Sequence, residues 1–125
     1  MKYKHFIIGG AQRSGTTLLY HVLDKHPDIY MAKPVKPEPK FFLKEHEYEK
    51  GYDFYLNQYF GEQFVFRWYG EKTTSYMEFE EVPERIKHIL PDASLIFILR
   101  NPVYRALSNY FFSSNNNLET RTLQQ

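Results

Sequence analysis

The hydrophobic pattern near the N-terminus predicts a buried strand that runs through a turn into a helix. An apolar run, residues 6–8, ends at Gly9 and Gly10, and polar turn residues follow. Beyond this turn, apolar side chains recur at the spacing of one helix face: Leu18, Leu19, Val22 and Leu23. We expect this helix to cover about residues 15–25 and to end before Pro27, because proline disfavours helical geometry in the residue before it.

A proline-rich segment follows this first unit. Residues 33–40 hold three prolines and three lysines, a composition that excludes a helix interior or a central strand. We expect an extended loop whose end is anchored in the core by Phe41 and Phe42, which would fix the position of Glu38 between two prolines. The alternative is a solvated linker.

The middle of the chain alternates between helical and strand-like patterns. Aromatic residues between positions 45 and 60 fall near helical spacing, interrupted by Gly51, and predict one broken or two short helices. Residues 64–69 have strand composition, and residues 70–76 are expected to form a polar strand end or loop. Apolar residues from position 82 to 90 predict another helix, with a proline in its first turn.

The clearest buried strand of the sequence is predicted at residues 94–99, which include five consecutive apolar residues. It ends at Arg100, and residues 101–111 have the N-cap, the early proline and the apolar spacing of a further helix. Residues 113–125 are polar and are expected to form a frayed tail. Strands alternating with helices predict an α/β fold, one domain over residues 1–125, with a parallel sheet flanked by helices.

Composition narrows the classes of partner. The chain has 125 residues and a net charge of +1, so it offers no basic scaffold for nucleic acid and no polybasic membrane surface. Any anion site must therefore come from local placement of arginine and lysine. No cysteine is present, which excludes disulfides and thiolate metal sites. We expect a cytoplasmic protein without a membrane span, whose five histidines, lacking metal-ligand spacing, occupy incidental surface or boundary positions.

The turn after the first strand has the features of an anion-binding loop. Glycines let the backbone approach an anion, and the following helix start adds partial positive charge. Gly10, Gly15 and Thr17 match the ATP-binding template G-x-x-x-x-G-K-[ST], but Thr16 replaces its lysine, and the nearest cation is Arg13. We predict a site for a phosphate-like group. The alternatives are glycines that serve only packing, or a degraded mononucleotide kinase loop.

Three features of the chain are expected to meet at one edge of the sheet, because ligands of open α/β sheets bind beyond the carboxyl ends of the strands. They are the loop of residues 10–17, the segment of residues 70–75, and Arg100. Ser108, about two helical turns beyond Arg100, is expected to face the same site. Two separate anion sites indicate a ligand with two phosphate-like groups, unless Arg100 pairs with a carboxylate at the surface.

Four segments occur in the order AQRSGTTLL, KPEPKFF, GEKTTSY and LRNPVYRALSNY between residues 6 and 112. Together they resemble the N-terminal part of sulfotransferases that use 3′-phosphoadenosine-5′-phosphosulfate (PAPS), of a bacterial type similar to the branch that modifies glycans such as heparan sulfate. The resemblance implies a sheet like that of P-loop kinases. Because family members continue well beyond the last segment, it also implies a partial domain, truncated at the C-terminus.

By position, the resemblance assigns six loop residues to the 5′-phosphosulfate: Arg13, Ser14, Gly15, Thr16, Thr17 and Leu18. Arg13 takes the place of the usual loop lysine and would stabilise charge on the departing oxygen. Arg100 and Ser108 would bind the 3′-phosphate.

The resemblance also implies two residues at the reacting centre. Glu38 matches the general base of the glycan-modifying branch, although Pro37 stands where that branch often has lysine. Lys72 resembles a lysine near the sulfuryl group in some members. A sulfuryl group carries less charge than a phosphoryl group, so arginine and backbone N–H groups would suffice and no metal is expected.

The implied function is transfer of a sulfuryl group from PAPS to a hydroxyl or amine of a small molecule, glycan or lipid. One alternative is a truncated, catalytically inactive remnant that binds nucleotide. The other is a P-loop nucleotide kinase, which would need magnesium and ATP. An incomplete sheet edge would favour a homo-oligomer.

Overall fold

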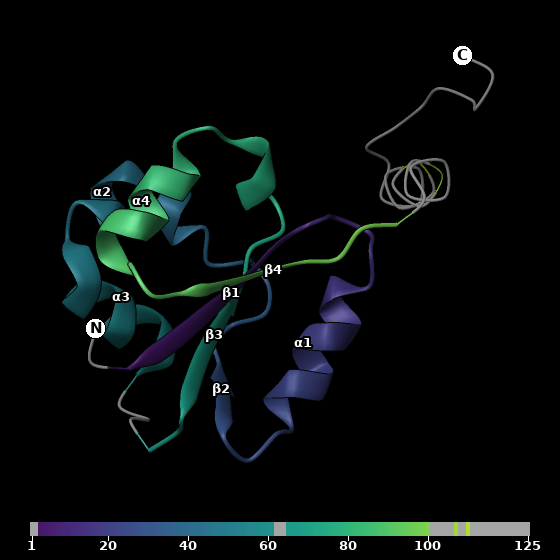
Figure 1. The fold of residues 1–125 in the computed structure, drawn as a ribbon, viewed down its shortest axis with the longest axis horizontal. Coiled ribbons are helices and arrows are strands. Elements are labelled where there is room, and N and C mark those ends of the chain that lie inside the picture. The colour runs from purple at the N-terminus through teal and green to yellow at the C-terminus, as the bar shows by residue number, and fades with distance from the viewer. Residues whose placement is uncertain (1–2, 62–64, 101–106, 108–109, 111–125) are drawn as a thin grey trace.

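The computed structural model describes residues 3–61, 65–100, 107 and 110 of the 125-residue chain. The described residues form a sheet of four parallel strands in the order β2-β3-β1-β4 (Figure 1). The strands are β1 (Lys4–Gly10), β2 (Ile29–Met31), β3 (Trp68–Lys72) and β4 (Ser94–Phe97). The predicted α/β fold with a parallel sheet is confirmed.

Helices cover both faces of this sheet (Figure 1). One face carries α1 (Thr16–Asp24), and the opposite face carries α2 (Glu45–Tyr48), α3 (Gly51–Phe60) and α4 (Val82–Ile89). Short 3-10 turns at Phe41–Leu43 and Tyr76–Glu78 complete the second layer. The predicted helices after the glycine loop, on either side of Gly51, and at residues 82–90 are confirmed. No helix within the described ranges is long and apolar enough to cross a membrane.

The core lies on both sides of β1, because successive strand residues point to opposite faces. Ile7 packs into an aromatic cluster beneath α3 and α4, whereas Phe6 and Ile8 face α1 and pack with Tyr20. Burial of both strand faces explains the continuous apolar run in this segment. Phe41 and Phe42 are fully buried in the aromatic cluster, so they anchor the proline-rich loop as predicted.

The prediction for β3 was wrong in its boundaries. The strand covers Trp68–Lys72, so residues 65–67 of the predicted strand lie outside it, whereas residues 70–72, expected as a polar strand end or loop, form its carboxyl end. In this register Gly70 pairs with Phe6 of β1, where a Cβ atom would lie 2.1 Å from the Phe6 ring, so the position requires glycine. The sequence pattern also missed β2, which has only three residues.

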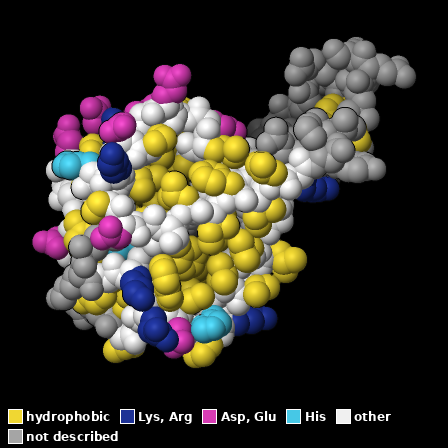
Figure 2. All heavy atoms as spheres, in the orientation of Figure 1, with side chains coloured by type: hydrophobic (Ala, Val, Ile, Leu, Met, Phe, Trp, Pro, Cys, Tyr) yellow, Lys and Arg dark blue, Asp and Glu magenta, His cyan; other side chains and the backbone are white. Residues whose placement is uncertain are grey.

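The prediction that residues 94–99 form a buried strand was also wrong in part. Within the described part of the chain β4 pairs only with β1, and Leu95, Phe97 and Leu99 are 48%, 48% and 70% exposed. With Met77 and Phe79 they line an apolar groove of about 410 Å³. Figure 2 shows apolar side chains gathered over this face. Hydrophobicity predicted the strand correctly but could not show that it lies at an edge.

His5 contradicts the prediction that the histidines occupy surface or boundary positions. It lies on β1 with 1% of its surface exposed, among the rings of Tyr55, Phe60 and Tyr69. Its Nε2 atom lies 2.9 Å from the Tyr52 hydroxyl oxygen. Burial disfavours the charged imidazolium and lowers the pKa of His5 to about 4.

This depressed pKa predicts that the protein loses stability in mild acid. The ordinary pKa is 6.5, so between that pH and about 4 the unfolded chain binds a proton that the folded chain does not. As the pH drops from 6.5 to about 4, the free energy of unfolding should therefore decrease by roughly 3 kcal/mol in total.

Urea unfolding at pH 7.5 and at pH 4.5 measures the effect. The difference in the free energy of unfolding between the two pH values should be smaller in His5→Phe than in the wild type. It should be unchanged in the matched control His21→Gln, whose side chain is exposed. An equal pH dependence in His5→Phe and the wild type would contradict the prediction.

Candidate functional site

A pocket of about 630 Å³ lies at the carboxyl edge of the sheet. Its lining residues come from the glycine loop, the start of α1, the proline-rich loop, the end of β3 and the end of β4: Gln12, Arg13, Gly15, Thr16, Thr17, Lys36, Glu38, Lys40, Lys72, Thr74 and Arg100. The structure thus brings together the three sequence features that were predicted to meet at this edge.

The glycine loop delivers the chain directly into α1. Gly15 has a φ of 86°, a left-handed conformation that favours glycine, and Thr16 then begins the helix. The N–H groups of the first turn have no intrahelical acceptors and carry partial positive charge. Both Thr16 and Thr17 line the pocket, so these donors lie at its wall. This arrangement suits an anionic group.

Glu38 is held in the same pocket by two neighbours from the β3 end. Its Oε2 atom lies 2.7 Å from the Lys72 ammonium nitrogen. Its Oε1 atom accepts hydrogen bonds from the backbone N–H and the hydroxyl of Thr74, each at 3.0 Å. The Lys72 side chain is 4% exposed and the Glu38 side chain 16%. The carboxylate is therefore fixed in place while part of it stays open to the pocket.

Lys72 also connects Glu38 to the glycine loop. Its ammonium donates to the Thr17 hydroxyl at 3.4 Å as well as to the Glu38 carboxylate. A single cation thus lies between the candidate base and the candidate anion site. This position allows it to interact with groups bound on either side.

The pocket is strongly cationic although the chain as a whole is nearly neutral. Five cationic side chains line it against a single carboxylate, Glu38, among the residues that the structure describes: Arg13, Lys36, Lys40, Lys72 and Arg100. Such a concentration of charge attracts anions. Within the same described residues, the Arg100 guanidinium bonds to the Arg13 carbonyl oxygen at 2.8 Å and to no carboxylate.

Three of the predicted site residues are not placed in the pocket lining. Ser14 is buried, and its hydroxyl donates to the Gln12 carbonyl oxygen at 3.4 Å. The Leu18 side chain is 71% exposed. Ser108 lies outside the described residues.

Lys36, Lys40 and Thr74 line the pocket but were not singled out from the sequence. The sequence offered only a weak signal: Lys36 and Lys40 lie two residues to either side of Glu38, and Thr74 lies two residues beyond Lys72. Strand-like alternation does not place them, because Lys40 has a left-handed φ of 56° and Thr74 lies in a turn.

Comparisons with known proteins agree with this architecture. The sulfotransferase domain family matches residues 3–124. The chain is 35% identical over 113 residues to the bifunctional heparan sulfate N-deacetylase/N-sulfotransferase 1 of Mus musculus, covering 87% of this chain and 13% of that protein. It is 35% identical over 112 residues to the human heparan sulfate glucosamine 3-O-sulfotransferase 6, covering 87% of this chain and 30% of that protein.

The fold is also similar to that of a sulfotransferase of known crystal structure. The sulfotransferase from Alicyclobacillus acidocaldarius superposes with a TM-score of 0.81 at 29% identity, over 99% of this chain and 55% of that one. The chain therefore spans about half of the solved structure, and less than a third of the two relatives named above. From the match over residues 3–124 and the shared fold, we conclude that the chain belongs to the sulfotransferase family.

Proposed function

We propose that this chain takes part in sulfuryl transfer from PAPS to a hydroxyl or amine of a glycan, with Glu38 as the general base. The observation that carries the proposal is the placement of the Glu38 carboxylate in a cationic pocket, linked through Lys72 to the start of α1. A base and an anion site in one pocket are the two elements that sulfuryl transfer requires.

The donor would use both anion-binding regions of the pocket. The N–H groups at the start of α1 and the Arg13 side chain would hold the 5′-phosphosulfate, and Arg100 with Ser108 would hold the 3′-phosphate. A pocket of about 630 Å³ falls in the size range of sites for small ligands and cofactors. The Arg100 guanidinium donates a hydrogen bond to the Arg13 carbonyl oxygen, which links these two regions.

The proposed chemistry gives the carboxylate and the cations of the pocket different tasks. Glu38 would take the proton from the acceptor hydroxyl or amine while the freed oxygen or nitrogen forms a bond to sulfur. The bond between sulfur and the 5′-phosphate oxygen breaks, and its electron pair stays on that oxygen. Arg13 and Lys72 would offset the negative charge that develops there. Lys72 needs little movement, because it already contacts Thr17 at the start of α1.

The glycan acceptor is inferred from the named relatives and from the charge of the pocket. Those relatives are named as heparan sulfate N- and 3-O-sulfotransferases, so an amine and a hydroxyl are both acceptors within this family. Lys36 and Lys40 flank the base and would favour an acceptor that carries acidic groups.

Binding of adenosine 3′,5′-bisphosphate, measured by calorimetry, tests the donor site. We expect binding that does not require magnesium and that weakens at least tenfold, about 1.4 kcal/mol, in Arg100→Ala. Lys25→Ala, which removes an exposed cation outside the pocket lining, is the matched control and should bind as the wild type does. Tighter binding of ATP with magnesium would instead favour a nucleotide kinase.

A Glu38→Gln variant tests the base. It keeps the size of the side chain but removes its ability to take a proton, so turnover should fall by a factor of about 10² to 10⁴. Binding of adenosine 3′,5′-bisphosphate should stay within about twofold of the wild type, because no donor contact is assigned to Glu38.

Transfer of radiolabelled sulfate to a de-sulfated glycan measures this turnover. The matched control Glu84→Gln makes the same change on the exposed surface of α4 and should leave turnover unchanged. Wild-type nucleotide binding without any transfer would support the alternative of an inactive nucleotide-binding remnant.

A further inference from the structure

A buried carboxylate, Glu71, lies on the side of β3 opposite the pocket. Its neighbour Lys72 faces the pocket, so alternation along the strand directs Glu71 into the aromatic cluster. Glu71 is fully buried and accepts hydrogen bonds from three hydroxyls: Tyr55 at 2.7 Å, Thr73 at 2.7 Å, and Tyr76. Burial raises the pKa of Glu71, and these donors act in the opposite direction by stabilising the charged form.

Two of these hydroxyls also hold the loop that carries Glu38. The Thr73 hydroxyl oxygen accepts from the backbone N–H of Lys40 at 3.1 Å, and the Tyr76 hydroxyl oxygen accepts from the backbone N–H of Phe42 at 3.2 Å. Each hydroxyl has a single hydrogen, and that hydrogen is donated to Glu71. The carboxylate thus takes up both hydroxyl hydrogens and turns the oxygen lone pairs toward the two N–H groups of the loop.

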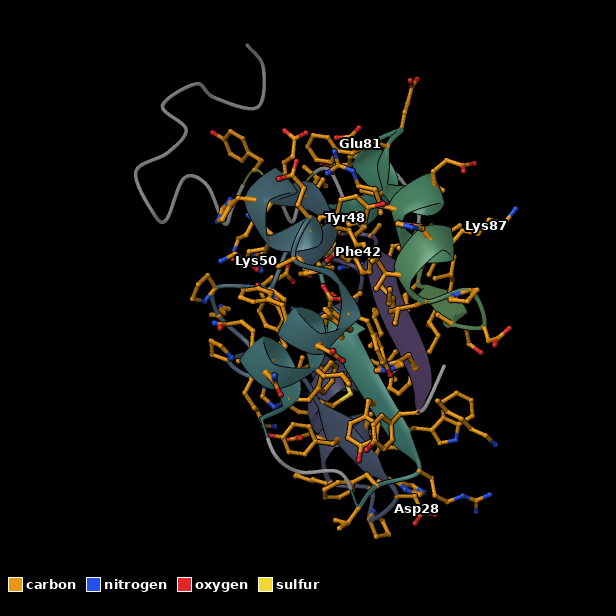
Figure 3. The ribbon with its side chains drawn as sticks, turned by 90° about the vertical axis from the view of Figure 1, so that its left-hand side faces the viewer. Asp28, Phe42, Tyr48, Lys50, Glu81 and Lys87 are labelled. Atoms are coloured by element: carbon orange, nitrogen blue, oxygen red, sulfur yellow. The ribbon has the colours of Figure 1, made fainter. Side chains whose placement is uncertain are left out.

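Further contacts leave this segment few ways to move. The Tyr59 hydroxyl lies between the Glu47 carboxylate and the Pro39 carbonyl oxygen, which is 3.1 Å away, and the Phe42 carbonyl accepts from the Arg85 guanidinium at 3.0 Å. Figure 3 shows Phe42 and Tyr48 close together between α2 and α4, and their ring centroids lie 6.4 Å apart. The segment is thus held at Pro39 and over the three residues beyond it, immediately after the residue assigned as base.

We infer that Glu71 is a positioning residue for Glu38. Its carboxylate orients the Thr73 and Tyr76 hydroxyls, these hold the backbone of residues 40–42, and the loop in turn places Glu38 against Lys72 and Thr74. We call this chain of hydrogen bonds, from Glu71 through Thr73 and Tyr76 to residues 40–42, the relay. The catalytic consequence rests on the proposed function, whereas the relay itself does not. Groups that must be placed to within a fraction of an ångström need such support from their surroundings.

The hydrogen-bond geometry predicts different effects for two substitutions of Glu71. Both loop-facing hydroxyls donate to the same atom, Oε2, whereas Tyr55 alone donates to Oε1. Glutamine at this position can keep an oxygen at the shared site and turn its amide group toward Tyr55. Glu71→Gln should therefore preserve the relay, and Glu71→Leu should abolish it.

Amide hydrogen exchange in the 125-residue chain tests the relay without any assay of activity. The Thr74 amide reports on Glu38, because it donates to that carboxylate at 3.0 Å. The adjacent Thr73 amide is an internal reference, since it donates to the Ile8 carbonyl across the sheet at 3.0 Å. A change in the ratio of the two exchange rates identifies a change in opening that differs between these adjacent amides.

A matched pair of variants makes the test independent of whether Glu71→Leu folds. Tyr76→Phe and Tyr55→Phe each remove one hydroxyl from Glu71, but only Tyr76 bonds to the loop. In Tyr76→Phe we expect exchange at the Phe42 and Thr74 amides to accelerate about tenfold or more relative to Thr73. In Tyr55→Phe the ratios should stay within about twofold of the wild type. Equal ratios in the two variants, or an unchanged Thr74 amide in Tyr76→Phe, would overturn the inference.

Measurements of turnover distinguish a positioning role of Glu71 from a purely structural one. In Tyr76→Phe, kcat should fall about tenfold to a hundredfold with the KM for the donor within about twofold, and Glu71→Gln should retain wild-type values within about threefold. Loss of donor affinity in parallel with kcat would overturn the assignment to Glu38. A wild-type chain without transfer activity refutes the proposed function instead, and the amide ratios still decide the relay.

Discussion

The parallel pairing of β1 with both β3 and β4 is the constraint on which the site depends. In its register Ile7 pairs with Glu71 and with Leu95, so all three strands end at the same edge of the sheet. The glycine loop, Lys72 and Arg100 come directly from those ends or shortly beyond them. Groups distant in sequence therefore share one pocket because of strand direction, before any specific side-chain contact is considered.

Strand β3 divides two tasks between adjacent residues. Lys72 points to the pocket, where it joins Glu38 to the start of α1, and Glu71 points to the core, where its hydroxyl partners contact the loop that bears Glu38. Side chains on both faces of β3 therefore help to position the Glu38 carboxylate. A buried acid within an aromatic cluster is costly unless its oxygens are hydrogen-bonded, and here the donors that satisfy it also bond to the loop.

The sequence predicted those parts of the structure that follow from local pattern. The glycine loop with its helix, the anchoring of the proline-rich loop, and the meeting of three segments at one edge all depend on periodicity, turn residues and parallel topology. The position of β4 at the edge of the described sheet and the full burial of Glu71 depend on contacts distant in sequence, which no local pattern encodes. The pocket brings Glu38, Lys72 and Arg100 together, while the roles assigned to them remain predictions.

The prolines around Glu38 have a consequence for the energy of ligand binding. A proline ring fixes its own φ and restricts the residue before it to extended geometry, so Pro37 and Pro39 limit the conformations of the unfolded loop. Ordering this loop consequently costs less conformational entropy than ordering a flexible one. The candidate base is held in place before any ligand arrives. Free energy gained on binding is then not consumed in ordering the loop and remains available for aligning the reacting groups.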